Sequence, residues 1–266
     1  MRRINSFLKP LSEEEIAKKE RDSYEKAKTN LERMSYWLPL VSAKNFLSIP
    51  QTQIIQFNFE MFKELLSDKN HEKTIEKLQL LFEQEVELSG ELFMKTGNFS
   101  DKFHFSTPHL KDRANAGKQF YSMWYTSLMF GVPLTTEWVL REFISNKEEL
   151  DDIYDGMPLR TEYRVFFDFD TKEVIGISNY WHPNVMKNGI RDEGDLSTYK
   201  NNEERIIEEF NAYKHYVIEL VVKQVENCGL KGKWSIDVMK NGDEFYLIDM
   251  ARMEFSALIN EMEEMK

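Results

Sequence analysis

The sequence predicts an α+β protein in which helices dominate the N-terminal part and antiparallel hairpins the C-terminal part. Three observations indicate this class. Apolar residues recur at helical spacing over 71–88. Apolar–polar runs flank Asn241-Gly242, a pair that suits a tight hairpin turn because both positions accept a positive φ. A second pair of such runs, 160–169 and 173–181, flanks a short polar turn.

The composition limits the class of protein. The 266 residues are 41% hydrophobic and 13% aromatic, enough for a sizeable core in one or two domains. A net charge of −11 disfavours a nucleic-acid partner. One cysteine, Cys228, excludes an intramolecular disulfide and a cysteine-based zinc site. No apolar run could span a bilayer and the N-terminus lacks a signal-peptide pattern, so we expect a cytoplasmic protein without a membrane partner.

Residues 1–90 are predicted to form a helix-rich N-terminal region. Ser12 followed by three glutamates is typical of an N-cap and an acidic first turn, and the helical pattern continues to residue 37, before Pro39. Further helices are expected over 60–67 and 71–88. No pattern in this region indicates chemistry.

Residues 91–145 carry the first candidate for chemistry. The expected elements are a strand over 91–96, a loop or hairpin over 97–105, a helix over 113–130 and a strand over 135–144 that runs into a linker. Lys95 ends the first strand, just before a loop of small, polar and aromatic residues, where its ammonium group can reach phosphate oxygens. The alternative is an ordinary surface lysine. Lys102, within the loop, is a second candidate.

The hairpin over 160–181 offers an anion-binding face. Arg160, Glu162 and Arg164 alternate along its first strand and therefore share one face, while the apolar residues between them share the other. Guanidinium groups match the geometry of phosphate and carboxylate. A cross-strand ladder of salt bridges explains the pattern equally well in a chain with 30% charged residues. Both interpretations stay open.

The C-terminal part carries two acidic residues inside apolar strands. The expected elements are a polar loop over 182–201, a long helix over 202–227, a closing hairpin over 234–250 and a terminal helix over 251–265. Asp237 and Asp249 lie one in each strand of that hairpin. A carboxylate among buried side chains is costly unless it is paired or holds a cation, and magnesium favours such oxygen ligands. Solvation at a strand end, or pairing with lysine or arginine, is the alternative.

The order of these elements resembles the ATP-grasp superfamily over residues 91–254. The shared order is a strand with a lysine, a covering loop, a helix, a linker strand, a strand with an arginine, a long helix and a closing acidic hairpin. Within the superfamily the chain is most similar to the divergent branch named for two arginines and a lysine. It is also similar to the related cell-division-cycle chaperones that assemble a translation initiation factor. The resemblance implies two α+β subdomains, over 91–145 and 146–266, that clasp a nucleotide between antiparallel sheets.

The resemblance also implies a site for ATP and magnesium. Lys95 and Arg164 match the catalytic phosphate contacts, and Asp237 and Asp249 match the metal ligands. The linker that holds adenine corresponds to Arg141, Glu142, Phe143 and Ile144, and Lys102 is a further candidate nucleotide contact. Candidate substrate contacts are Arg160, Glu162, Asn179, Arg252 and Glu254. Two departures are Ala251, where an asparagine is usual, and a covering loop with Gly97 as its only glycine.

For function, the resemblance implies an ATP-dependent carboxylate–amine or carboxylate–thiol ligase. A substrate carboxylate would attack the γ-phosphorus of ATP, and an amine would capture the acylphosphate, so no side-chain nucleophile is needed. The loop over 97–105 would act as a lid against water. The substrate is unidentified, with a peptide or protein among the candidates. The alternative is an ATP-binding assembly chaperone or adaptor without turnover and, less favoured, an enzyme that modifies nucleic-acid ends.

Overall fold

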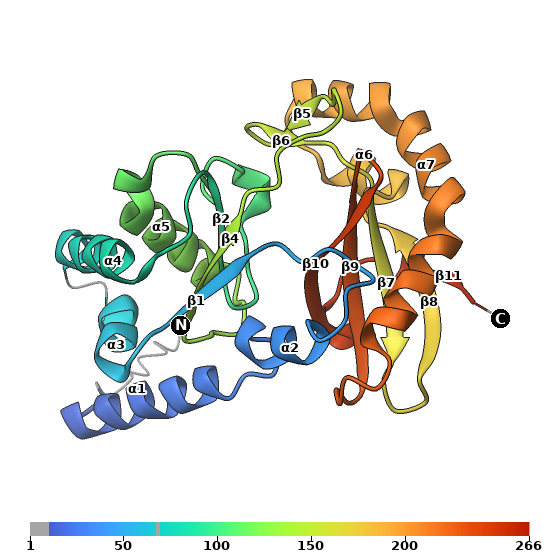
Figure 1. Ribbon diagram of the computed structural model, residues 1–266. Helices are drawn as coiled ribbons and strands as arrows, with labels where there is room; N and C mark the ends of the chain where they lie inside the picture. The colour runs from blue at the N-terminus through green and yellow to red at the C-terminus, as the bar shows by residue number, and fades with distance from the viewer. Residues whose placement is uncertain (1–10, 68–69, 266) are drawn as a thin grey trace, which may run out of the picture.

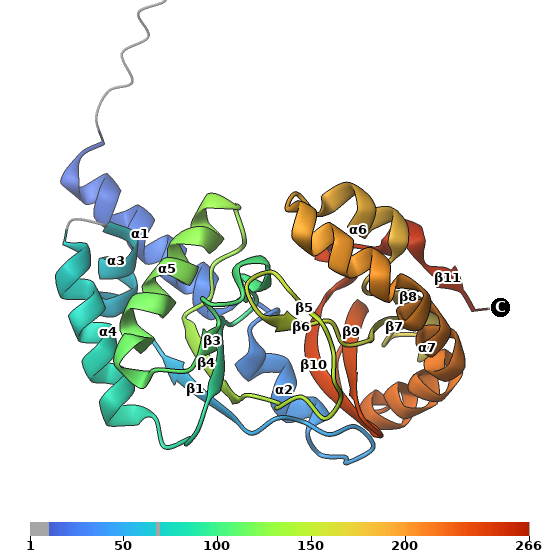
Figure 2. The same ribbon diagram turned by 90° about the horizontal axis from the view of Figure 1, so that it is seen from above.

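Two α+β lobes face each other in the computed structural model, which describes residues 11–67 and 70–265 (Figures 1 and 2). The N-terminal lobe has the strands β1 (Thr52–Gln56), β2 (Leu92–Thr96), β3 (His109–Leu110) and β4 (Glu137–Glu142), in the order β1-β4-β2-β3. The C-terminal lobe has β7 (Glu162–Asp168), β8 (Glu173–Asn179), β9 (Lys233–Asn241), β10 (Glu244–Arg252) and β11 (Glu263–Glu264), in the order β10-β9-β7-β8-β11. All neighbouring strands of both sheets are antiparallel, which confirms the predicted α+β class.

The N-terminal helices begin where the sequence predicts but divide differently. Ser12 and Glu15 form a capping box at the start of α1 (Glu13–Lys28). The predicted single helix is wrong beyond that point, because the chain turns after Lys28 and a second helix, α2 (Met34–Val41), contains Pro39. The helices α3 (Phe59–Ser67) and α4 (His71–Glu85) follow, close to the predicted ranges.

Helices cover one face of the N-terminal sheet. The side chains of Leu92 and Met94 from β2 pack with Phe120 and Trp124 of α5 (Ala116–Met129) and with Phe82 of α4. β1, which the sequence did not predict, pairs with β4 and so adds a segment of the first sixty residues to this sheet. Residues of β2 that alternate with the buried ones are left facing the other lobe.

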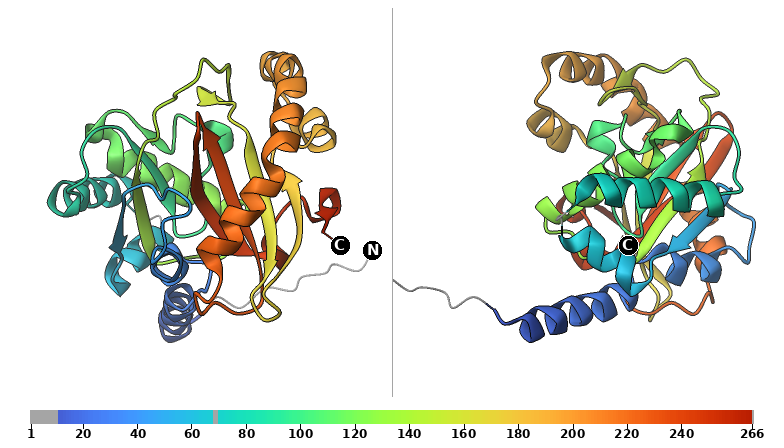
Figure 3. Two further views of the ribbon diagram at one scale, coloured as in Figure 1. Left: turned by 45° about the vertical axis from the view of Figure 1, so that its right-hand side comes forward. Right: turned by 90° about the vertical axis from the view of Figure 1, so that its left-hand side faces the viewer.

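The C-terminal sheet has one apolar and one charged face. Tyr163, Val165 and Phe167 of β7 pack in the core with Val217 and Val221 of the long helix α7 (Glu193–Val225), as the predicted alternation requires. Figure 3 shows α7 lying across this face. The opposite face of β7 therefore points to the N-terminal lobe. No helix in the described ranges is long and apolar enough to cross a bilayer.

Two predicted elements near the C-terminus are wrong. The polar loop expected over 182–201 contains α6 (Pro183–Gly189) and the first turns of α7, which begin at Pro183 and at the N-cap Asp192, two ordinary start signals. The terminal helix expected over 251–265 is absent, because β10 continues to Arg252. Two short 3-10 turns, η3 (Met253–Phe255) and η4 (Ile259–Glu261), and the strand β11 follow. Leu258 between the turns has φ +70°, which a helix does not accept.

A buried glutamine fixes the segment between α2 and β1 to α7. The Gln224 side chain accepts hydrogen bonds from the N–H groups of Phe46 and Leu47 and donates to the carbonyls of Val41 and Lys44, at 2.6–3.0 Å. Gln224→Leu should therefore lower the free energy of unfolding by about 2–3 kcal/mol, because leucine leaves these groups unpaired. Urea unfolding would measure the loss, with Gln51→Leu at an exposed position as the control. Equal stability of the two variants would contradict the role.

Candidate functional site

A cleft between the two sheets contains most of the residues that the sequence singled out. Its lining includes side chains from both lobes and from the segment that joins them. The predicted site residues found there are Lys95, Lys102, Arg141, Glu142, Phe143, Ile144, Arg160, Glu162, Arg164, Asp237 and Asp249. Residues separated by more than 150 positions thus meet in one place.

A β-bulge brings the two candidate aspartates together. Leu247 of β10 lies opposite Val238 of β9, but Asp249 lies opposite Asp237, so Ile248 is an extra residue. Side chains alternate along a strand, so without this bulge Asp249 would share the core face with Leu247. The bulge places both carboxylates on the face that lines the cleft.

Each aspartate is paired with a cation. Arg164 forms a two-point contact with Asp237, from Nε to Oδ1 and from Nη2 to Oδ2, both at 2.7 Å. Burial opposes the charge of Arg164, but the nearby Asp237 outweighs it and raises the pKa of the guanidinium group. Nη1 of Arg164 donates to the carbonyl of Ala257 at 3.1 Å. These contacts fix the guanidinium plane at the base of the cleft.

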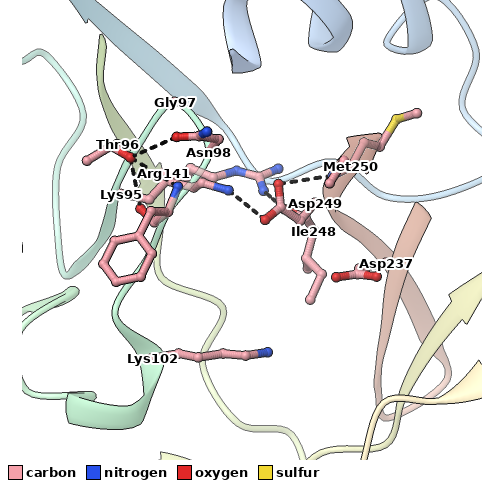
Figure 4. Close-up of polar contacts among 12 residues, drawn as sticks. Lys95, Thr96, Gly97, Asn98, Lys102, Arg141, Asp237, Ile248, Asp249 and Met250 are labelled. Atoms are coloured by element: carbon pink, nitrogen blue, oxygen red, sulfur yellow. Dashed lines mark hydrogen bonds and ion pairs between the residues drawn. The ribbon is translucent and has the colours of Figure 1, made fainter. Parts of the chain in front are cut away.

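Lys95 connects the two lobes. Its Nζ lies 2.6 Å from Oδ2 of Asp249, as Figure 4 shows, although Lys95 is on β2 and Asp249 on β10. The Lys95 side chain is 2% exposed and that of Asp249 is 33% exposed. The alternative interpretation, that Lys95 is an ordinary surface lysine, is therefore wrong. The ammonium group lies inside the cleft, beside a carboxylate that solvent can still reach.

Arg141 also connects the lobes, but through backbone groups. It donates from Nε to Thr52 Oγ1 at 3.0 Å, and its Nη atoms donate to the carbonyls of Ile248 and Leu247 on β10. Burial lowers the pKa of Arg141 to about 10, against the attraction of Asp249 and Glu142. These hydrogen bonds hold the bulge of β10 against the N-terminal lobe.

The linker after β4 has a backbone donor without a hydrogen-bond partner among the described residues, at Ile144, a residue that lines the cleft. The N–H of Phe143 donates to the carbonyl of Glu91, and the carbonyl of Ile144 accepts from Arg160 Nη2 at 2.7 Å. The N–H of Ile144 makes no hydrogen bond to any residue that the structure describes. The ring of Phe143, which lines the cleft, stacks on His109, with centroids 3.8 Å apart. This stacking fixes the position of the linker.

Residues of the predicted covering loop line the cleft. Lys102 lies in the turn η1 (Lys102–His104), 3.4 Å from Glu162 Oε2, and its Nζ is 3.5 Å from the centroid of the Tyr180 ring. Burial works against the charge of Lys102, but Glu162 and Tyr180 outweigh it and raise its pKa. Burial also raises the pKa of Glu162, against the attraction of Lys102. The loop is thus held down by an ion pair and a cation–π contact.

Three predicted substrate residues are not brought to the cleft. Asn179 is buried and accepts a hydrogen bond from the N–H of Trp181, so its side chain serves the turn after β8. Arg252 pairs with Glu254 at 3.3 Å, and the side chain of Glu254 is 55% exposed. The predicted terminal helix, which was expected to contain Arg252 and Glu254, does not form. The geometry does not support a substrate role for any of them.

The cleft also contains residues that the sequence analysis did not select. Phe93 and Met239 line it because each lies two positions from a selected residue on the same strand, Lys95 and Asp237. The two-residue repeat of side chains along a strand could therefore have predicted both positions. Pro50, which comes from the N-terminal region, lines the cleft without any local signal in the sequence.

Four carboxylates line the cleft, those of Glu142, Glu162, Asp237 and Asp249. Asp237 and Asp249 supply two oxygen ligands, and the described residues contain no group of three or more acidic, histidine or cysteine side chains that could hold an ion. Magnesium commonly takes one or two protein carboxylates when phosphate oxygens and water complete its shell. The pair fits magnesium that arrives with a phosphate ligand, and not a metal held by protein alone.

Two lobes with facing antiparallel sheets agree with the ATP-grasp fold that the sequence predicted. The chain shares this fold with Cdc123 from Schizosaccharomyces pombe, at a TM-score of 0.51 and 16% sequence identity, over 90% of this chain and 94% of that one. A C-terminally truncated form of Cdc123 matches at a TM-score of 0.51 and 15% identity, over 92% and 95% of the two chains. A RimK domain protein ATP-grasp from Sphaerobacter thermophilus matches at a TM-score of 0.38 and 11% identity, over 86% and 61%. No family model and no curated protein matches the sequence.

Proposed function

We propose that the cleft binds ATP together with magnesium, and that the chain acts as an ATP-binding assembly chaperone or adaptor for a protein partner. One observation supports nucleotide binding above all. In a chain of net charge −11, one cleft brings together five cationic side chains against four carboxylates. The cations are Lys95, Lys102, Arg141, Arg160 and Arg164, and the carboxylates are Glu142, Glu162, Asp237 and Asp249. Phosphate groups are the ligands that such a cluster suits.

The residues divide into a base end and a phosphate end. The free N–H of Ile144, with Met157 and Met239 nearby in the lining, offers a donor and apolar walls for adenine. Lys95 and Arg164, on facing sheets, would neutralise the phosphates, each by giving up part of its contact with an aspartate. Asp237 and Asp249 would hold magnesium, which withdraws charge from phosphate oxygens when bound. The covering loop with Lys102 would keep water out.

Two observations favour a chaperone or adaptor over a ligase. The likeness to Cdc123 extends over nearly the whole of both chains, and the cell-division-cycle chaperones are one of the families that the sequence resembles. The metal site is also reduced, because Ala251 stands where the superfamily usually has asparagine and Glu254 is outside the cleft.

Asp249→Asn tests the nucleotide site. The amide keeps the shape of the side chain but removes the charge that magnesium needs, so magnesium-dependent affinity for ATP should fall at least about tenfold. Calorimetric titration of ATP with magnesium would measure this, with Asp170→Asn in an exposed turn as the matched control. Unchanged affinity in Asp249→Asn would remove this residue from the site. A wild type that does not bind ATP would overturn the proposal.

A ligase is the second candidate, because a further hollow opens from the cleft at Arg164 and Tyr180. An acyl donor placed there could attack the γ-phosphorus of ATP, releasing ADP, and an amine could then displace phosphate from the acylphosphate. The two candidates differ in turnover. Release of ADP that depends on an added carboxylate and amine would favour the ligase, whereas retention of bound ATP would favour the chaperone.

A further inference from the structure

A second hollow, of about 670 Å³, adjoins the cleft and shares Arg164 and Tyr180 with it. Its apolar walls come from five separate segments of the chain. They are formed by Phe103 of the covering loop, Tyr154, Trp181, Val185 and Met186 of α6, and Leu258. We call this hollow the apolar groove.

The covering loop completes the apolar groove. The rings of Phe103 and Tyr154 meet edge to face, with centroids 5.2 Å apart, and the N–H of Phe105 donates to the carbonyl of Tyr154 at 3.0 Å. Tyr154 lies between the short strands β5 (Asp152–Ile153) and β6 (Met157–Pro158), in the other lobe. The covering loop therefore forms one wall of the groove through Phe103.

The side chains of the groove define the chemistry of what it holds. Phe103 and Val185 remain 57% and 42% exposed at its rim, an unusual position for two large apolar side chains that face one hollow. Three carboxylates line it. Asp192 and Asp195 accept hydrogen bonds from the backbone N–H groups of Asp195 and Tyr154, and Asp155 is exposed. Arg164 is paired with Asp237. The other basic side chains that line the groove are Arg191 and His104, and His104 is paired with Asp101. The groove is apolar at its walls and acidic in balance.

We infer that the apolar groove binds an extended segment of a partner protein that carries a large apolar side chain next to lysine or arginine. The apolar side chain would lie between Phe103 and Val185, and the basic one near Asp155. This inference rests on the proposed function in one respect: ATP, by holding the covering loop down, should strengthen peptide binding. By linkage, the peptide should strengthen ATP binding by the same factor.

Selection of random peptides displayed on phage, against the protein with ATP and magnesium, tests the inference. The enriched peptides should combine an aromatic or aliphatic residue with lysine or arginine. Their synthetic, fluorescently labelled forms would then be titrated by anisotropy. Val185→Lys should weaken binding at least about tenfold, because it removes an apolar contact and adds a repelling charge. Leu80→Lys, at a similarly exposed apolar residue on α4, is the control and should bind as the wild type does.

A second variant tests the charge alone. Asp155 has φ +64°, a conformation that asparagine also accepts, so Asp155→Asn changes the charge without straining the turn. Asp155→Asn should lower the affinity for the enriched peptides several-fold. It should not change the affinity for the same peptides with alanine in place of the basic residue. Absence of enrichment, enrichment of acidic peptides, or equal binding by wild type and Val185→Lys would each overturn the inference. Calorimetry with ATP separates the two proposals: peptide binding without ATP binding would overturn the nucleotide site and leave the groove.

Discussion

Arg164→Leu should lower the free energy of unfolding by about 3–5 kcal/mol, because it leaves a buried carboxylate without its partner. The side chains of Arg164 and Asp237 are 11% and 8% exposed, and their two-point contact is the most complete charge pairing in the cleft. Asp237 without the guanidinium group would have to remain charged without its partner at a position that is 8% exposed, or take up a proton. Urea unfolding in the absence of nucleotide would measure the loss.

A double variant separates the pairing from simple packing. Arg164→Leu combined with Asp237→Leu removes both charges, so it should be distinctly more stable than Arg164→Leu alone. If the single and double variants are equally unstable, the loss comes from packing of the long arginine side chain and not from the unpaired charge. Arg164→Lys should fall between wild type and Arg164→Leu, because an ammonium group keeps the charge but loses one of the two contacts with Asp237 and the contact with Ala257.

The sequence predicts the strands of the C-terminal sheet well because their signals are local. Alternation of Tyr163, Val165 and Phe167 with charged residues defines both faces of β7, and Asn241-Gly242 defines the turn between β9 and β10. β1 carries no such pattern over Thr52–Gln56 and is a strand because it pairs with β4, eighty residues later in the chain. The predicted helix at the end of the chain is wrong for a similar reason. Its composition suits a helix, but the backbone at Leu258 does not.

The residues of the candidate site divide in the same way, into those with a local sequence signal and those placed by long-range contacts. Arg164 was selectable because charged residues alternate with apolar ones along its strand, and Asp237 because it is charged within an apolar run. The two are neighbours in the register of β7 and β9. The position of Asp249 opposite Asp237 depends on the bulge at Ile248, which no residue of the strand signals. The contact of Lys95 with Asp249 depends on how the two lobes meet. Sequence patterns carry no information on that long-range packing, which is why the resemblance to a known fold was needed to group these residues.

Lys95→Met should lower the affinity for ATP at least about a hundredfold while affinity for adenosine stays nearly unchanged, because the lost contact is to phosphate. Methionine has a similar length and is apolar, so it keeps the packing of β2 around a side chain that is 2% exposed. Asp249 is partly solvated, so the loss of its partner should cost little stability. Calorimetric titration of the two ligands into wild type and variant would measure the difference.

The control for Lys95→Met is Lys147→Met, which removes an exposed ion pair with Glu244 at 2.9 Å outside the cleft and should bind ATP as the wild type does. Equal weakening of ATP and adenosine by Lys95→Met would mean that the variant disturbs the cleft as a whole, and that Lys95 is a tie between the lobes. Selective loss of ATP would mean that the ammonium group exchanges Asp249 for phosphate when the nucleotide binds. In that case Asp249 is released for magnesium by the same event, and the Lys95–Asp249 and Arg164–Asp237 pairs are the resting form of a phosphate and metal site.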